Sequence, residues 1–68
     1  MTVAPGDNLW VIAERSLAGA LHRHPSIHET APYWLQVVDA NRSRLTDPGN
    51  PDLVLPGQVI AMPPPPAG

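Results

Sequence analysis

The first regular pattern in the chain is an apolar stripe at helical spacing. It consists of Leu9, Ile12, Ala13, Leu17 and Ala20. Positions three and four apart share one face of a helix, so the stripe predicts a helix from about residue 9 to residue 21. Asp7 or Asn8 can supply a side-chain oxygen to its first unpaired amides. Trp10 lies off the stripe, and we favour a core position over a half-exposed one for so large an apolar side chain.

A second helical stripe follows a stretch without a sustained period. Its members are Trp34, Leu35, Val37, Val38 and Asn41. Residues 22–30 are predicted to be a connecting loop, because Pro25 opposes a continuous helix. The second helix is expected over residues 32–42, with Thr30 or Ala31 as its cap and Pro32 in its first turn.

Three side chains of the second helix have distinct expected roles. The spacing places Trp34 on the buried face, whereas Tyr33 is expected to point elsewhere. Asn41 is expected to end the helix in a left-handed conformation. Its amide is also expected to bond a neighbouring loop, a structural role that we favour over ligand contact.

Two Pro-Gly pairs punctuate the chain, at Pro5-Gly6 and at Pro56-Gly57. Proline presets φ near −65° at the second turn position, and glycine accepts the positive φ of the third. Each pair therefore predicts a type II turn. The first turn should lead into a helix, and the second should lead into a strand.

Short apolar segments beside these turns predict strands at residues 2–4 and 59–62. Residues 43–51, which are rich in turn formers, are predicted to be an exposed loop. The order strand, helix, helix, strand indicates an α+β domain. Because an isolated strand pair is marginal in water, the two strands are expected to pair with each other and to lie on the helices.

Three motifs in this order resemble the LysM domain, a small sugar-binding module of bacterial cell walls. They are TVAPGDNLWVIA at residues 2–13, VVDANR at 37–42 and DLVLPGQVIAMP at 52–63. The resemblance covers nearly the whole chain and implies a βααβ fold, with both helices on one side of a two-stranded antiparallel sheet. Residues 1–62 would form the domain, and the proline-rich residues 63–68 a linker or tail. The connection between the helices is longer than is usual for the family and is similar to actinobacterial versions.

The resemblance also implies binding of β-1,4-linked N-acetylglucosamine, in peptidoglycan or chitin, in a shallow groove between two loops. Carried over by position, the groove residues are Gly6, Asp7, Asn8, Leu9, Asp52, Leu53, Val54 and Leu55. Main-chain amides, carbonyls and small apolar side chains suit an uncharged N-acetyl group. Leu55 departs from the family, which often has an aromatic residue there, so stacking on a sugar ring would be lost.

Each of these groove residues also has a structural interpretation. Gly6 is as well explained by turn geometry as by close approach of a ligand, and the two are compatible. For Asp7 and Asn8, helix capping is favoured over ligand contact.

Composition narrows the classes of function. The 68 residues carry a formal charge of −2, with four arginines and no lysine, so nucleic acid is not expected as a partner. Cysteine is absent. No apolar run reaches the length of a membrane span, so membrane insertion by this segment is not expected.

The sequence gives little support for a catalytic or metal-binding site. Asp7 and Asp52 would superficially resemble a glycosidase pair, but so small a domain is poorly suited to raising a carboxyl pKa by burial. The spacing of His22, His24 and His28 matches no catalytic zinc pattern, and a solvated loop is favoured. We therefore expect no enzymatic activity, no metal and no cofactor.

The first functional hypothesis is a noncatalytic, monomeric module that anchors a larger protein, through flanking domains, to cell-wall glycan. The family places such a module in the cell envelope or outside the cell. An alternative is a LysM-like fold without sugar binding, which acts as a protein-interaction or spacer domain. A third hypothesis, a helix-turn-helix DNA binder, is disfavoured by the acidic balance.

Overall fold

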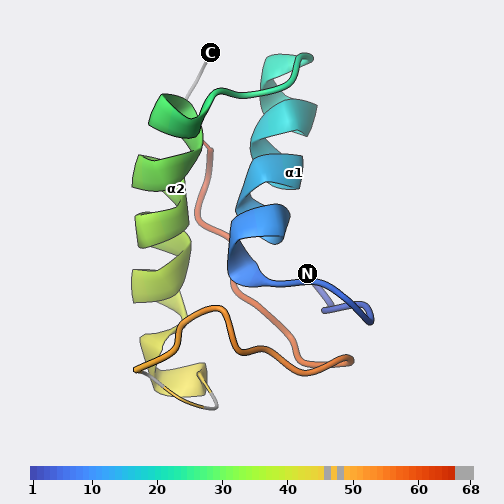
Figure 1. Ribbon diagram of the computed structural model, residues 1–68, viewed down its shortest axis with the longest axis vertical. Coiled ribbons are helices and arrows are strands. Elements are labelled where there is room, and N and C mark those ends of the chain that lie inside the picture. Colours follow the sequence, from blue (N-terminus) through green and yellow to red (C-terminus); the bar gives the residue numbers. More distant parts are fainter. Residues whose placement is uncertain (46, 48, 66–68) are drawn as a thin grey trace.

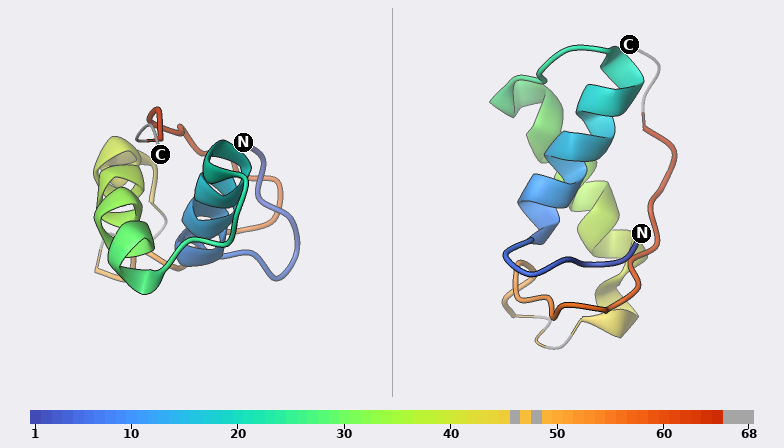
Figure 2. Two further views of the ribbon diagram at one scale, coloured as in Figure 1. Left: turned by 90° about the horizontal axis from the view of Figure 1, so that it is seen from above. Right: turned by 90° about the vertical axis from the view of Figure 1, so that its right-hand side faces the viewer.

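The computed structural model describes residues 1–45, 47 and 49–65. Its elements are α1 (Leu9–Leu21), α2 (Ile27–Ala40) and a short 3-10 helix, η1 (Arg42–Arg44). The helices α1 and α2 lie side by side and run in opposite directions (Figure 1). The segment after the second turn runs alongside both helices (Figures 1 and 2).

Helix α1 has the predicted bounds. Asn8 is its N-cap, in an extended conformation, and its Oδ1 accepts a hydrogen bond from the Val11 amide at 2.8 Å. The helix ends where His22 adopts a left-handed conformation with φ of 56°. The apolar stripe and the adjacent cap together explain why this helix was predictable.

The predicted start of the second helix is wrong, because α2 begins at Ile27 rather than at residue 32. Ser26 is the N-cap in place of Thr30 or Ala31, and its hydroxyl accepts from the Glu29 amide. The Glu29 carboxylate accepts in return from the Ser26 amide, which completes a capping box. This reciprocal pair starts the helix upstream of Pro32.

Two further predictions for the second helix are also wrong. Asn41 has φ of −115° and is not left-handed. Tyr33, expected to point elsewhere, is 1% exposed, and its hydroxyl donates to the Pro63 carbonyl at 2.6 Å. Trp34 is partly buried and packs against the edge of the core. The face of α2 that meets α1 is centred on Thr30, Tyr33 and Val37, so Trp34 lies to one side of it.

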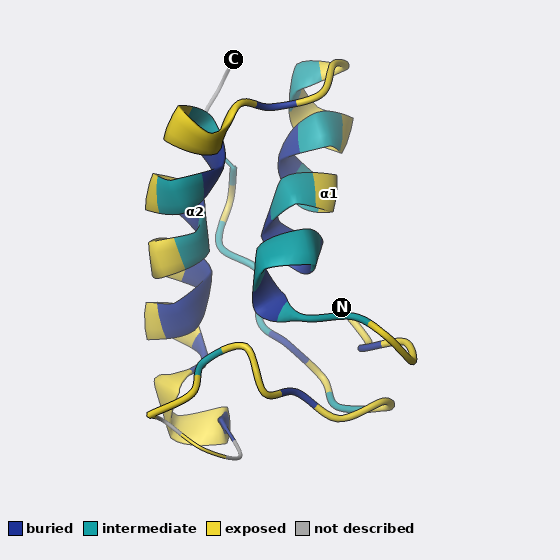
Figure 3. Cartoon of the chain, in the orientation of Figure 1, coloured by how far each residue is buried: buried dark blue, intermediate teal, exposed yellow. Residues whose placement is uncertain are grey.

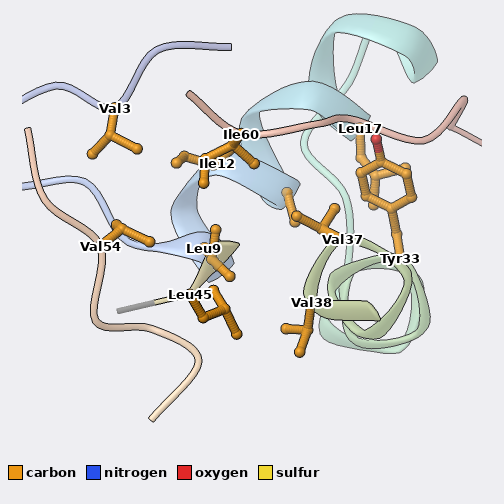
Figure 4. Packing of buried hydrophobic residues seen from close by; sticks show 11 residues of the cluster. Val3, Leu9, Ile12, Leu17, Tyr33, Val37, Val38, Leu45, Val54 and Ile60 are labelled. Atoms are coloured by element: carbon orange, nitrogen blue, oxygen red, sulfur yellow. The ribbon is translucent and has the colours of Figure 1, made fainter. Parts of the chain in front are cut away.

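The hydrophobic core fills the space between the helices and the segments that cross them. The inward faces of α1 and α2 are buried, and the outward face of α2 is exposed (Figure 3). The cluster consists of Val3, Leu9, Ile12, Ala13, Leu17, Tyr33, Val37, Val38, Leu45, Val54 and Ile60. Figure 4 shows Tyr33 and Leu17 at one end of this core and Val3 and Val54 at the other. The segments outside the helices therefore complete it.

The predicted α+β fold with a two-stranded sheet is not what the structure shows. Its described part is mostly helical, and the two terminal segments meet in a single antiparallel bridge between Thr2 and Val59. Pro5 and Pro63 lie just beyond this short contact, and a proline has no amide hydrogen to donate to a ladder. Ala61, two residues after Val59, directs both its main-chain groups to the Asn41 side chain instead.

The first residues of the predicted tail contact the helices. Besides accepting the bond from Tyr33, Pro63 is partly buried, and so is Pro65. Residues 66–68 of the predicted linker lie outside the described residues, as do Thr46 and Pro48 of the predicted loop.

Candidate functional site

Both Pro-Gly pairs form the turns that the sequence predicted. In the first, the Asp7 amide donates to the Ala4 carbonyl at 3.1 Å, and in the second the Gln58 amide donates to the Leu55 carbonyl at 3.0 Å. Gly6 has φ of 86° and Gly57 has φ of 87°. This is the conformation that glycine adopts without a Cβ clash.

The two turns lie beside each other, although Gly6 and Gly57 are 51 positions apart in the chain. The Gly57 amide donates to the Val3 carbonyl at 2.7 Å, and the Val3 amide donates to the Gln58 carbonyl at 2.9 Å. The residue that precedes the first turn is thus bonded to the end of the second. The first loop, residues 6–9, and the second loop, residues 52–55, lie at the same end of the molecule (Figure 2).

In the first loop, polar side chains of the candidate set serve the local structure. One Asp7 oxygen accepts from Arg15 at 2.9 Å and the other accepts from the Ala4 amide at 3.0 Å. These bonds, that from Arg15 above all, hold the pKa of Asp7 below its usual value. Only 8% of the Asp7 side chain is exposed, so little of it is open to a ligand. Gly6 is exposed.

The second loop presents more of its side chains to solvent. Asp52 is exposed, and Leu53 and Leu55 are 41% and 53% exposed. The Leu55 amide donates to the Gln58 side-chain oxygen, and the Gln58 side-chain amide donates to the Arg44 carbonyl at 3.0 Å. These bonds connect the second turn to η1.

Two members of the candidate set, one from each loop, have their side chains in the hydrophobic core. Leu9 is fully buried and Val54 is 8% exposed, and both belong to the same core cluster (Figure 4). Their side chains are therefore packed against the protein, so Leu9 has no surface open to a ligand and Val54 has almost none. The groups open at this surface are the Gly6 main chain and the side chains of Asp52, Leu53 and Leu55.

An aromatic pair borders this surface, and sequence reasoning did not assign it to the site. The rings of Trp10 and Trp34 are 5.8 Å apart at 59°. Trp34 Nε1 donates to Asp52 Oδ1 at 3.2 Å, which links α2 to the second loop. Trp10, expected in the core, is only partly buried. Nothing in the local sequence signalled the bond to Asp52, which joins residues 18 apart.

A surface depression of about 230 Å³ borders the first loop through Arg15, which bonds Asp7. It is lined by Met1, Ile12, Arg15, Ser16 and Met62. Its lining is largely apolar and includes none of the predicted groove residues.

Among the described residues, no three His, Asp or Glu side chains are grouped closely enough to hold a metal ion. The three histidines are exposed, with His28 in α2 rather than in a loop. Neither α1 nor α2, nor the other described helix, has the length and apolar character needed to cross a membrane.

Comparisons of the chain with models of protein families, with curated proteins and with solved structures find no match.

Proposed function

We propose that this chain is a noncatalytic module that binds a glycan containing N-acetylglucosamine, of the peptidoglycan or chitin type. The observation that carries the proposal is the pair of main-chain hydrogen bonds between Val3 and the second turn. They keep the two loops of the candidate set adjacent. The resemblance of the three sequence motifs to LysM domains supplies the class of ligand.

The chemistry of the open surface suits an uncharged ligand. Gly6 brings the main chain to the surface without a Cβ, and an added Cβ there would meet no atom within 4 Å. Leu53 and Leu55 offer apolar contact for an acetyl methyl group. The Asp7 carboxylate is neutralised by Arg15, which lowers the cost of placing a neutral sugar beside it.

Such a surface predicts modest affinity for each module. A shallow site buries little of its ligand, so useful retention on a cell wall would come from several modules or from flanking domains. Anchoring of a larger protein in the cell envelope or outside the cell belongs to the same proposal.

Titration with chitin oligomers of increasing length, followed through the amide resonances of the labelled protein, tests the proposal. We expect shifts at residues 6–9 and 52–55 that grow with oligomer length. Cellulose oligomers are the matched ligand control, because they have the same linkage and lack the N-acetyl group. The absence of resonance shifts at both loops, or equal shifts with both ligands, would refute the proposal.

A pair of variants sharpens the test. Leu55→Asp places a charge at the candidate surface and should weaken chitin binding by about tenfold, since a carboxylate must be desolvated there. Leu35→Asp is the matched control, because Leu35 is 58% exposed on α2, similar to Leu55. Equal affinities of the two variants would count against this surface.

A second candidate function rests on the apolar character of the second turn. Leu53, Leu55 and Val59 are all more than 40% exposed. Leucine in place of an aromatic residue suits a protein-interaction or spacer role as well as it suits a sugar. A chain that fails to bind glycan in the titration would leave this role favoured.

A further inference from the structure

The second loop of the candidate site is anchored in the core by Val54, and most of its hydrogen bonds are short-range. The Asn50 amide donates to the Asp47 carbonyl, and the Leu53 amide donates to the Asn50 carbonyl at 3.0 Å. These bonds shape the loop without fixing where it lies. Among the hydrogen bonds of the described residues 49–55, only that from Trp34 to Asp52 reaches a helix.

Trp34 is itself well fixed. It projects from α2, packs against the edge of the core and contacts the ring of Trp10 in α1. Trp10 directly follows Leu9, the last candidate residue of the first loop. The aromatic pair therefore forms a continuous contact from the first loop, through both helices, to Asp52 in the second.

We propose that Trp34 is a positioning residue of the candidate glycan site, which holds the 52–55 loop in place through its indole N–H. This inference rests on the proposed function. An indole suits the role because its apolar body packs on the protein while its one donor points outward. The bond ends on a carboxylate, and hydrogen bonds to a charged acceptor are stronger than those between neutral groups.

The test compares substitutions that differ in one hydrogen bond. Trp34→Phe keeps an aromatic ring beside Trp10 and removes the donor to Asp52. Tyr33→Phe is the control, since it also removes one donor, but from a bond to Pro63. Chitin-oligomer affinity should fall about fivefold in Trp34→Phe and change less than about twofold in Tyr33→Phe.

A readout without ligand separates positioning from general destabilisation. Hydrogen exchange of the Leu53 amide should accelerate in Trp34→Phe and in Asp52→Ala, while the amides within α1 keep the exchange rates of the unchanged protein. Asp52→Asn retains a side-chain oxygen that accepts the indole N–H, so it should restore the slow exchange at Leu53 and the hydrogen-bonded indole N–H resonance. Because Asp52 is exposed, its variants are expected to fold even if the Trp34 variant does not.

The outcomes distinguish this inference from the proposed function. If the unchanged protein binds chitin oligomers and Trp34→Phe binds equally well, the positioning role is overturned and the glycan module stands. Equal exchange at Leu53 in Asp52→Ala and Asp52→Asn would also overturn it. If the unchanged protein does not bind, the glycan site and its positioning residue fall together.

Discussion

Replacing Asn41 by alanine should be among the most damaging single changes in this chain. Asn41 is fully buried, and its side-chain amide donates to the carbonyls of Val37 and Ala61, each at 2.7 Å. Its oxygen accepts from the Ala61 amide, also at 2.7 Å. Alanine removes all three bonds and leaves the main chain of Ala61 without these partners.

The size of the effect follows from the number of bonds. At about 1 kcal/mol for each net hydrogen bond, with a further cost for partly buried groups left unpaired, we expect a loss of about 3 to 4 kcal/mol. A chain of 68 residues has a total free energy of unfolding of about 3 to 10 kcal/mol. Asn41→Ala should therefore unfold a sizeable fraction of the protein.

Urea unfolding followed by tryptophan fluorescence measures this loss. For a small domain the free energy falls by about 1 kcal/mol per molar urea, so the midpoint should drop by about 3 to 4 M. Asn50→Ala is the matched control, because Asn50 is exposed and its loss should change the free energy by less than about 0.5 kcal/mol. A midpoint for Asn41→Ala that coincides with the control would refute the assigned role of the three bonds.

Two further predictions concern the capping box of α2 and the second turn. Arg23, whose guanidinium donates to Glu29 at 2.8 Å, and the Ser26 amide lower the pKa of Glu29 from 4.5 to about 2. This stabilisation is present above pH 4.5 and is lost as the pH falls toward 2, so Glu29→Gln should flatten the decline of the urea midpoint across that range. Gly57→Ala should cost about 1 to 2 kcal/mol because of its positive φ, whereas Gly19→Ala, at an exposed position of α1, should stabilise by about 0.5 to 1 kcal/mol, both by urea unfolding. Equal slopes in the pH series, or equal signs for the two glycine variants, would contradict these arguments.

The elements that could be predicted are those whose signals lie close together in the sequence. Helix α1 has its cap and its apolar stripe in consecutive turns, and both Pro-Gly turns carry their own φ requirements. The start of α2 differs from the prediction because Pro25 precedes the cap and Pro32 is tolerated inside the helix, so that Ser26 and Glu29 determine where it begins. That pair has the spacing of a capping box and was visible in the sequence.

The sheet was mispredicted for a different physical reason. Apolar, β-branched segments at residues 2–4 and 59–62 have the composition of strands, but composition does not reveal what competes for their main-chain groups. Asn41 takes both groups of Ala61, and Tyr33 takes the carbonyl of Pro63. These partners lie 20 and 30 residues away, so only the folded chain shows them.

That the two loops form a binding site stays a prediction, and the sequence did not reveal which of their atoms are exposed. The adjacency of the turns agrees with what the resemblance implied. Leu9, however, carried two conflicting signals, because it belonged both to the apolar stripe and to the groove set. The position of Leu9 in the apolar stripe explains why its side chain is buried rather than open to a ligand. The link from Trp34 to Asp52 depends on the path of a loop and left no local pattern.

The way in which the chain end is held makes the candidate site depend on α2. The main chain of Val3 bonds residues 57 and 58 at the end of the second turn, and the Met1 carbonyl accepts from the Ile60 amide. Farther along, the Asn41 side chain bonds Ala61 and the Tyr33 hydroxyl bonds Pro63. Ile60 lies between these contacts and is buried in the core. Because so short a bridge has little stability alone, release of the segment from Asn41 should also loosen the second turn from the first. Opening of the core and loss of the adjacent loops are therefore expected in one cooperative step.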